Sequence, residues 1–222
     1  HPPAALGEDT ALVGGAAGDY LQMQQTWVGT GSDVDSDAVV IAQIFSKQPL
    51  GIGIAHGHRA MSEPIMVTEA EGNVVRTLDG RPAWDVWKEK TRARALARGC
   101  DVTRLDPAEI PGFLLQYEAG LSVGSEIKLR SPLHLNPDGS LGFACGMPKG
   151  TVFRITESEP EGQIDSARRA AREARANLGG AEAAGAVAFD CICRNLILGQ
   201  RFQEAVRAMS AELGDAPLAG FE

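Results

Sequence analysis

The sequence is short of positive charge, of aromatic residues and of long apolar runs. Its 222 residues include 21 Lys and Arg against 29 Asp and Glu, so the net charge is −8, and only 5% of residues are aromatic. Nucleic-acid phosphates and anionic membrane surfaces repel a chain of this charge, and we expect neither as a partner. The apolar runs fall far short of the roughly 20 residues that a membrane helix needs, which predicts no membrane insertion.

Cysteine is also scarce: the chain has four, and no two of them stand in a CxxC pair. In a chain of this size, that usage is typical of reduced thiols in the cytoplasm rather than of a disulfide framework. Cys191 and Cys193 are separated by one residue, and in a strand their thiols would lie on the same face. They are either a metal or redox pair or, as is common for free cysteine, buried members of a core.

Apolar residues make up 44% of the sequence, which is enough for a substantial core. The first half contains successive strand patterns without helices between them, which predicts an antiparallel sheet. These patterns are Asp19–Gly29, Ala38–Phe45, Gly51–Ala55, Ile65–Val67 and Asn73–Leu78. A hairpin turn is predicted within 31–37, and another at Asp79-Gly80, a dipeptide that accepts the positive φ of tight turns. A helix is predicted over 83–98, with Gly99 ending it.

The second half mixes strands with helices. Strands are predicted over 110–116, 127–133, 141–145, 152–155, 184–193 and 217–221. The Ser158-x-x-Glu161 pattern resembles a capping box and predicts a helix that ends at Gly179-Gly180. A further helix is predicted over 200–213. The predicted fold class is therefore α+β, with largely antiparallel or mixed sheets layered with helices in two intimately packed sub-domains.

The stretch from Gly51 to Arg59 is the best candidate for a site. Its alternating glycines weaken a strand and mark a place where another group packs against bare backbone. His56, Gly57, His58 and Arg59 follow directly and concentrate hydrogen-bonding groups at the end of this stretch. The imidazoles are contacts of a polar ligand, structural residues, or ligands of haem or a metal. Zinc would need two further ligands, whereas haem needs one axial histidine and an apolar pocket.

Arginine and cysteine supply further candidates. Arg59 and Arg194 either anchor a carboxylate, which a guanidinium group binds through two hydrogen bonds, or pair with local acidic residues. Cys191, with His56 as its base, could instead be the nucleophile of a cysteine hydrolase. Since no third orienting residue or oxyanion motif stands at a recognised spacing, binding is the preferred prediction.

Several short motifs resemble the FIST domain family. Similar to the latter part of a FIST amino-terminal domain are Gly53-x-x-His56-Gly57-x-Arg59, Val67-Thr68, Gly72-Asn73-Val74-Val75 and Leu78-Asp79-Gly80-Arg81-Pro82-Ala83. Similar to a FIST carboxy-terminal domain are Phe189-x-Cys191 with Arg194, Leu198-Gly199, Phe202 and Pro217-Leu218-Ala219-Gly220-Phe221. The resemblance implies that residues 1–99 are the latter part of the first domain and residues 100–222 most of the second.

The same resemblance implies a bacterial sensory and signal-transducing module that binds a small molecule in a cleft between the two sub-domains. The ligand-binding residues expected from the motifs are His56, Gly57, His58, Arg59, Cys191 and Arg194. Some relatives bind haem and sense nitric oxide, so the alternative is a haem-binding sensor with His56 or His58 as axial ligand. Because the chain has no kinase, cyclase or chemoreceptor pattern, its output is expected through a partner on another chain, such as a histidine kinase, a cyclase or a chemoreceptor.

Overall fold

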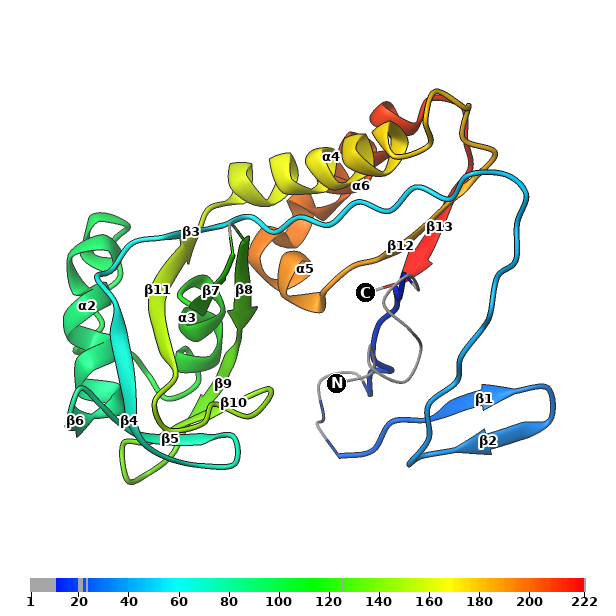
Figure 1. The fold of residues 1–222 in the computed structure, drawn as a ribbon. Coiled ribbons are helices and arrows are strands. Elements are labelled where there is room, and N and C mark those ends of the chain that lie inside the picture. The colour runs from blue at the N-terminus through cyan, green and yellow to red at the C-terminus, as the bar shows by residue number, and fades with distance from the viewer. Residues whose placement is uncertain (1–10, 20–21, 23, 125, 222) are drawn as a thin grey trace.

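The computed structural model describes residues 11–19, 22, 24–124 and 126–221. Its largest element is an antiparallel sheet with the strand order β8-β7-β11-β4-β5-β10-β9, in which β3 also pairs with β11 and β6 with β5 (Figure 1). The strands are β3 (His58–Ala60), β4 (Ile65–Glu71), β5 (Val74–Leu78), β6 (Arg81–Pro82), β7 (Ala119–Val123), β8 (Glu126–Arg130), β9 (Pro132–Leu135), β10 (Leu141–Phe143) and β11 (Val152–Ser158). Strands from both halves of the chain thus form one sheet, and the α+β class is confirmed.

Turn chemistry accounts for the hairpins of this sheet. Asp79 and Gly80 have φ of 49° and 76°, so the predicted turn is confirmed, and the Asp79 carboxylate accepts a hydrogen bond from the backbone of Met66 at 2.9 Å. A second turn between β9 and β10 is closed by Gly139, which has φ of 82°. Glycine adopts this left-handed backbone region without the steric cost that a side chain brings.

Helix α2 (Ala83–Ala97) covers the sheet and completes its core, as Figure 1 shows. Trp87 is fully buried, and its ring lies 6.1 Å from that of Phe143 and 5.9 Å from that of Phe153. The helix ends before Gly99, which has φ of 80°, so the predicted helix and its end are confirmed.

The other layer is helical. Helix α4 (Pro160–Ala176) packs along α6 (Phe202–Leu213), and α5 (Ile192–Leu198) packs beneath them, followed by the 3₁₀ turn η1 (Gly199–Arg201). The parallel pair β12 (Ala186–Phe189) and β13 (Leu218–Phe221) continues from this layer. The predicted helices ending at Gly179 and over 200–213 are confirmed.

Several predictions for the second half are wrong, among them the strand over 184–193, of which only Ala186–Phe189 forms β12. Residues 110–116 are a helix, α3 (Ile110–Gln116), because Pro111 fits the first helical turn and Phe113, Leu114 and Leu115 are all buried. A short apolar run does not distinguish a buried strand from a buried helix. The capping box is also absent: Ser158 ends β11, its hydroxyl accepts a hydrogen bond from Gln163 at 2.6 Å, and α4 begins after Glu159 without a side-chain cap.

In the first half, Ala38–Phe45 and Gly51–Ala55 have no regular secondary structure, because no strand among the described residues pairs with them. Phe45, expected to be buried, is 87% exposed. The end of the strand predicted over 19–29 contributes to β1 (Val28–Thr30), while Tyr20, Leu21 and Met23 lie outside the described residues. Strand β1 pairs with β2 (Asp33–Asp35) around Gly31, which confirms the predicted hairpin turn. Strand-forming residues therefore do not by themselves determine whether a neighbouring strand pairs with the segment.

Candidate functional site

The glycine-alternating segment lies along helix α4 (Figure 1). A Cβ atom on Gly53 would lie 1.9 Å from the carbonyl oxygen of Ala170, and one on Gly51 equally close to that of Ala174. The segment is held there by Asn177, which donates to the Ile52 carbonyl at 2.7 Å. The expectation that a group packs against this bare backbone is confirmed, and the group is the main chain of α4.

His56 lies at the end of this segment with both ring nitrogens engaged. Its Nε2 lies 3.0 Å from the carbonyl oxygen of Ile127 and donates to it. Its Nδ1 accepts a hydrogen bond from the backbone N–H of His58 at 3.2 Å. The two contacts define one neutral tautomer, in which no ring lone pair is free for a metal ion or haem iron. Gly57 follows in close contact with Gln163, whose backbone nitrogen would lie 2.7 Å from a Cβ atom on Gly57.

His58 is buried at the start of β3. Its Nδ1 lies 3.1 Å from the hydroxyl of Thr156 on β11. Burial and, to a smaller extent, the nearby His56 together lower the pKa of His58 to about 4. His58 is therefore neutral at physiological pH.

Arg59 belongs to a network of charged groups that the motifs did not reveal. Its side chain is bound to Glu157 at 2.9 Å and to Glu159 at 3.0 Å, and Arg98 from α2 binds the same two carboxylates. Glu157 is 2% exposed and is paired with three guanidinium groups, since Arg94 also lies 3.9 Å from it. No local pattern could have found Arg98, because it reaches Glu157 from a helix 59 residues away.

Arg194 is 9% exposed and binds within the helical layer. Its Nε lies 2.8 Å from Asp190, and its Nη1 donates to the Gln163 carbonyl and to the Ser166 hydroxyl on α4. The segments 56–59 and 191–194 therefore reach the same helix: Gly57 and Arg194 both contact Gln163. The sequence predicted that these two segments line a shared cleft. In the structure, both segments contact Gln163, and these contacts join groups of the protein itself.

Cys191 and Cys193 lie at the junction between β12 and α5, not in a strand as expected. Cys191 precedes the first helical residue and is exposed, whereas Cys193 is partly buried in the first turn. The Cys193 thiol is hydrogen-bonded to Cys191 and holds the pKa of the Cys191 thiol well below its usual range. The same interaction raises the pKa of Cys193.

Glu118 is a further buried polar group that sequence reasoning missed. It is 3% exposed, and its carboxylate accepts a hydrogen bond from Ser131 at 3.1 Å. Burial, opposed by the Ser131 hydrogen bond and assisted by the charge of Cys191, raises its pKa to about 7. No spacing or motif surrounds Glu118, so nothing in the sequence identified it.

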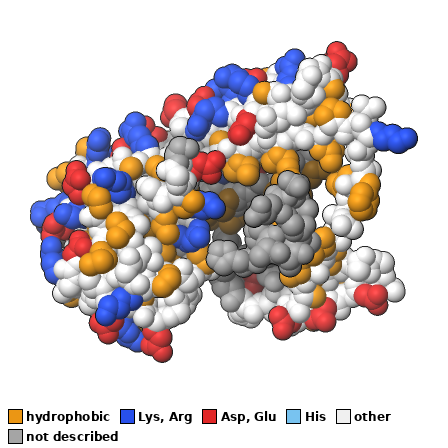
Figure 2. Space-filling view, viewed as in Figure 1, with side chains coloured by type: hydrophobic (Ala, Val, Ile, Leu, Met, Phe, Trp, Pro, Cys, Tyr) orange, Lys and Arg blue, Asp and Glu red, His pale blue; other side chains and the backbone are white. Residues whose placement is uncertain are grey.

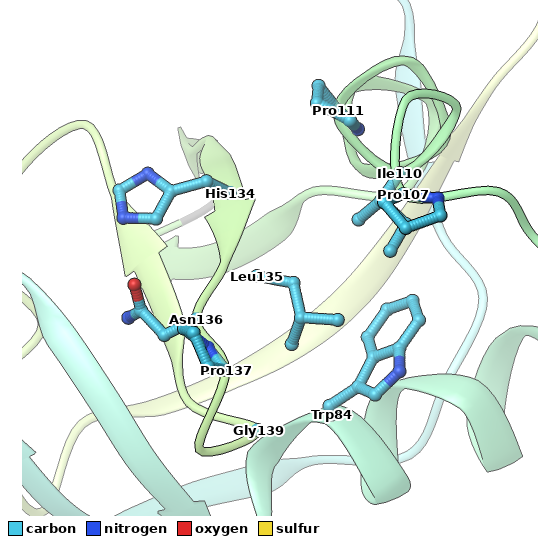
Figure 3. A pocket seen from close by; sticks show the side chains of 9 residues that line it. All are labelled: Trp84, Pro107, Ile110, Pro111, His134, Leu135, Asn136, Pro137 and Gly139. Carbon is cyan, nitrogen blue, oxygen red and sulfur yellow. The ribbon is translucent and has the colours of Figure 1, made fainter.

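Among the clefts on the described part of the chain, two are considered as binding sites. The larger, about 470 Å³, lies between α2, α3 and the turn after β9, and its lining is mainly apolar. Figure 3 shows Trp84, Leu135 and Ile110 pointing toward one another across it, while the His134 ring points away.

The smaller cleft, about 330 Å³, lies where the sheet meets the helical layer, and we call it the Arg98 cleft. It is lined by Arg98, Gln116, Ser158, Glu159, Pro160, Glu161 and Ile197. Arg59 lies beside it through its ion pair with Glu159. This cleft therefore combines charged, amide and apolar groups, which the larger one does not.

Within the described ranges, no three His, Cys, Asp or Glu side chains group together as a metal site requires. A search of the same residues finds no helix with the length and apolar character needed to cross a membrane. Acidic and basic side chains intermingle over the sheet and along α4 on the face shown in Figure 2.

Comparison with protein families finds two adjoining matches. The FIST N domain matches residues 3–81 and the FIST C domain matches residues 83–222. Neither the curated proteins nor the solved structures contain a match to this chain. Because the two family matches together span nearly the whole sequence, the chain belongs to the FIST domain family, whose domains are sensory modules of signal transduction.

Proposed function

We propose that this FIST chain binds a small polar molecule in the Arg98 cleft. The observation that carries the proposal is the position of this cleft between the ends of α2, α3, β11 and α5 and the first turn of α4. A cleft at the junction of two layers is a common place for a ligand, because closing on the ligand moves one layer against the other.

The chemistry of the lining suits a ligand that carries polar groups. Arg98 offers a guanidinium group, Gln116 an amide, and Glu161 a carboxylate, while Ile197 and Pro160 provide apolar contact. Arg59, one of the six predicted ligand-binding residues, is beside the cleft. Direct ligand contact by His56, Gly57, His58, Cys191 and Arg194 stays a prediction, and so do the domain division at residues 99 and 100 and the cytoplasmic location.

A ligand in this cleft would bridge Arg98 on the sheet side and Glu161 on α4. Glu161 is also paired with Arg201 at 2.9 Å, which connects the first turn of α4 to the start of α6. Binding would thus bias how the helical layer sits on the sheet, and a partner on another chain, such as a histidine kinase, a cyclase or a chemoreceptor, would respond to that change.

His56 does not fit the haem alternative as an axial ligand. Both nitrogens of His56 are hydrogen-bonded within the protein. His58 is 8% exposed and its Nδ1 is bonded to Thr156. An axial bond from His56 would require breaking at least one of these contacts. The hydrolase alternative lacks its base for the same reason, because His56 has no free nitrogen with which to activate Cys191.

A matched pair of Ile→Trp variants tests the proposal. Ile197→Trp fills the Arg98 cleft, whereas Ile110→Trp fills the larger apolar cleft and is the control. Thermal shift against a panel of free amino acids, dicarboxylates and nucleosides, with native mass spectrometry of the purified chain, would identify binders. We expect Ile197→Trp to abolish the shift and Ile110→Trp to retain it. The reverse result would assign binding to the apolar cleft and sink the proposal.

A further inference from the structure

Two thiols lie together at the exposed junction of β12 and α5. Cys191 is exposed immediately before α5, and Cys193 lies one residue further on, partly buried in the first turn of that helix. We propose that Cys191 and Cys193 form a redox site that hydroperoxides oxidise to an intramolecular disulfide. The inference is independent of the small-molecule site, since neither cysteine lines the Arg98 cleft.

The two thiols have the unequal character that such chemistry needs. The reactive form of cysteine is the thiolate, and a hydrogen bond from the Cys193 side chain stabilises the thiolate of Cys191. The charge of Arg194 acts in the same direction. Cys193 is the protonated donor of the pair and is more buried, and its place one residue from Cys191 makes it the resolving thiol.

The reaction balances with a hydroperoxide as the oxidant. The Cys191 thiolate attacks the terminal peroxide oxygen, the O–O bond breaks, and with hydrogen peroxide the products are a sulfenic acid and, after protonation, water. The Cys193 sulfur then attacks the Cys191 sulfur, the S–O bond breaks, and a second water leaves. Two thiols and one hydrogen peroxide thus become one disulfide and two waters.

Disulfide formation at this point would act on helix α4. The Asp190 carboxylate accepts hydrogen bonds from the Cys191 N–H at 2.9 Å and from Arg194 at 2.8 Å. Arg194 in turn holds the Gln163 carbonyl and the Ser166 hydroxyl. Drawing the two sulfurs into a covalent bond at the start of α5 would therefore disturb the contacts that hold the first turns of α4.

The other cysteines provide controls. Cys145 is exposed but has no thiol partner in the part of the chain that the structure describes, and Cys100 is partly buried with a pKa raised by burial. Because Cys145 and Cys191 are both exposed, a difference in their reactivity would reflect the neighbouring Cys193 thiol rather than access of the reagent to the sulfur.

The test treats the reduced full chain with hydrogen peroxide at pH 7 and maps the products by mass spectrometry after alkylation. We expect the unmodified chain and Cys145→Ser to form the 191–193 disulfide. We expect Cys193→Ser to stop at a Cys191 sulfenic acid that dimedone traps, and Cys191→Ser to form neither product. We also expect iodoacetamide to label Cys191 about tenfold faster than Cys145.

Hydrogen exchange of residues 160–166 separates a working redox site from an incidental disulfide. Oxidation should increase exchange there in the unmodified chain and leave Cys191→Ser unchanged. The proposal is overturned if Cys191 and Cys145 react at equal rates, if the disulfides formed are between chains, or if exchange in 160–166 does not respond to oxidation.

Discussion

The His58 imidazole and the Glu118 main chain share one hydroxyl group, that of Thr156. The hydroxyl donates to the Glu118 carbonyl oxygen at 2.9 Å and lies 3.1 Å from His58 Nδ1. Since the Thr156 hydroxyl donates its hydrogen to the carbonyl oxygen, it accepts a hydrogen bond from His58, and Nδ1 therefore carries the imidazole proton. Burial favours the neutral forms of both side chains, since it lowers the pKa of His58 to about 4 and raises that of Glu118 to about 7.

Glu118→Gln should stabilise the protein at alkaline pH. The pKa of Glu118 is raised from 4.5 to about 7 on folding, so between these values the unfolded chain loses a proton that the folded chain keeps. Stability from this group is complete below pH 4.5 and is lost as pH rises through 7, by up to about 3 kcal/mol. Gln keeps an acceptor for Ser131. Urea unfolding should therefore show a gain for the variant at pH 8 that is absent at pH 4.5; an equal difference at both would contradict the shift.

His58→Asn should flatten the loss of stability in acid. The pKa of His58 falls from 6.5 to about 4 on folding, so in this window the unfolded chain binds a proton that the folded chain does not. Stability from neutral His58 is present above pH 6.5 and decreases by up to about 3 kcal/mol as pH falls to 4. The Asn amide can still donate to Thr156. Any packing loss in the variant is independent of pH, so the slope of the unfolding free energy from pH 7 to 4 is the quantity to measure.

Gly53→Ala should loosen the extended segment from α4. The added Cβ would meet the Ala170 carbonyl at 1.9 Å, so the backbone must shift. We expect a destabilisation of about 1–3 kcal/mol. Gly112→Ala is the control, because a Cβ there meets nothing within 4 Å and Gly112 lies in helix α3, where Ala is favoured by about 0.5–1 kcal/mol. Thermal unfolding of the two variants should therefore move in opposite directions.

Arg194→Gln should be costly because it leaves a mostly buried carboxylate, Asp190, without its cation. Removing one member of a buried pair costs about 3–5 kcal/mol. Arg168→Gln breaks a comparable 3.0 Å pair with Asp165, but that arginine is 40% exposed, and we expect a loss below about 1 kcal/mol. Similar midpoints for the two variants in urea would contradict the structural role of Arg194.

Local patterns in the sequence predicted much of the fold. The turn at Asp79-Gly80 and the positive-φ glycines that follow α2 and α4, Gly99 and Gly179, depend on backbone conformations that glycine and its neighbours determine. Pattern reasoning was wrong at Ala38–Phe45, where strand-forming residues have no partner, and at Ile110–Gln116, where an apolar run is helical. Both errors concern what a segment packs against, which is not a local property.

For the candidate site, the sequence by itself determined that two segments are distinctive, 56–59 and 191–194, and the family match gives them a FIST context. Only the tertiary structure decided what these side chains do. It gives His56 a backbone partner at Ile127, brings Arg98 to Glu157, buries Glu118, and places Cys193 against Cys191 at a helix start. Residue identity sets which bonds a group can make, whereas burial and long-range packing decide which of them are made.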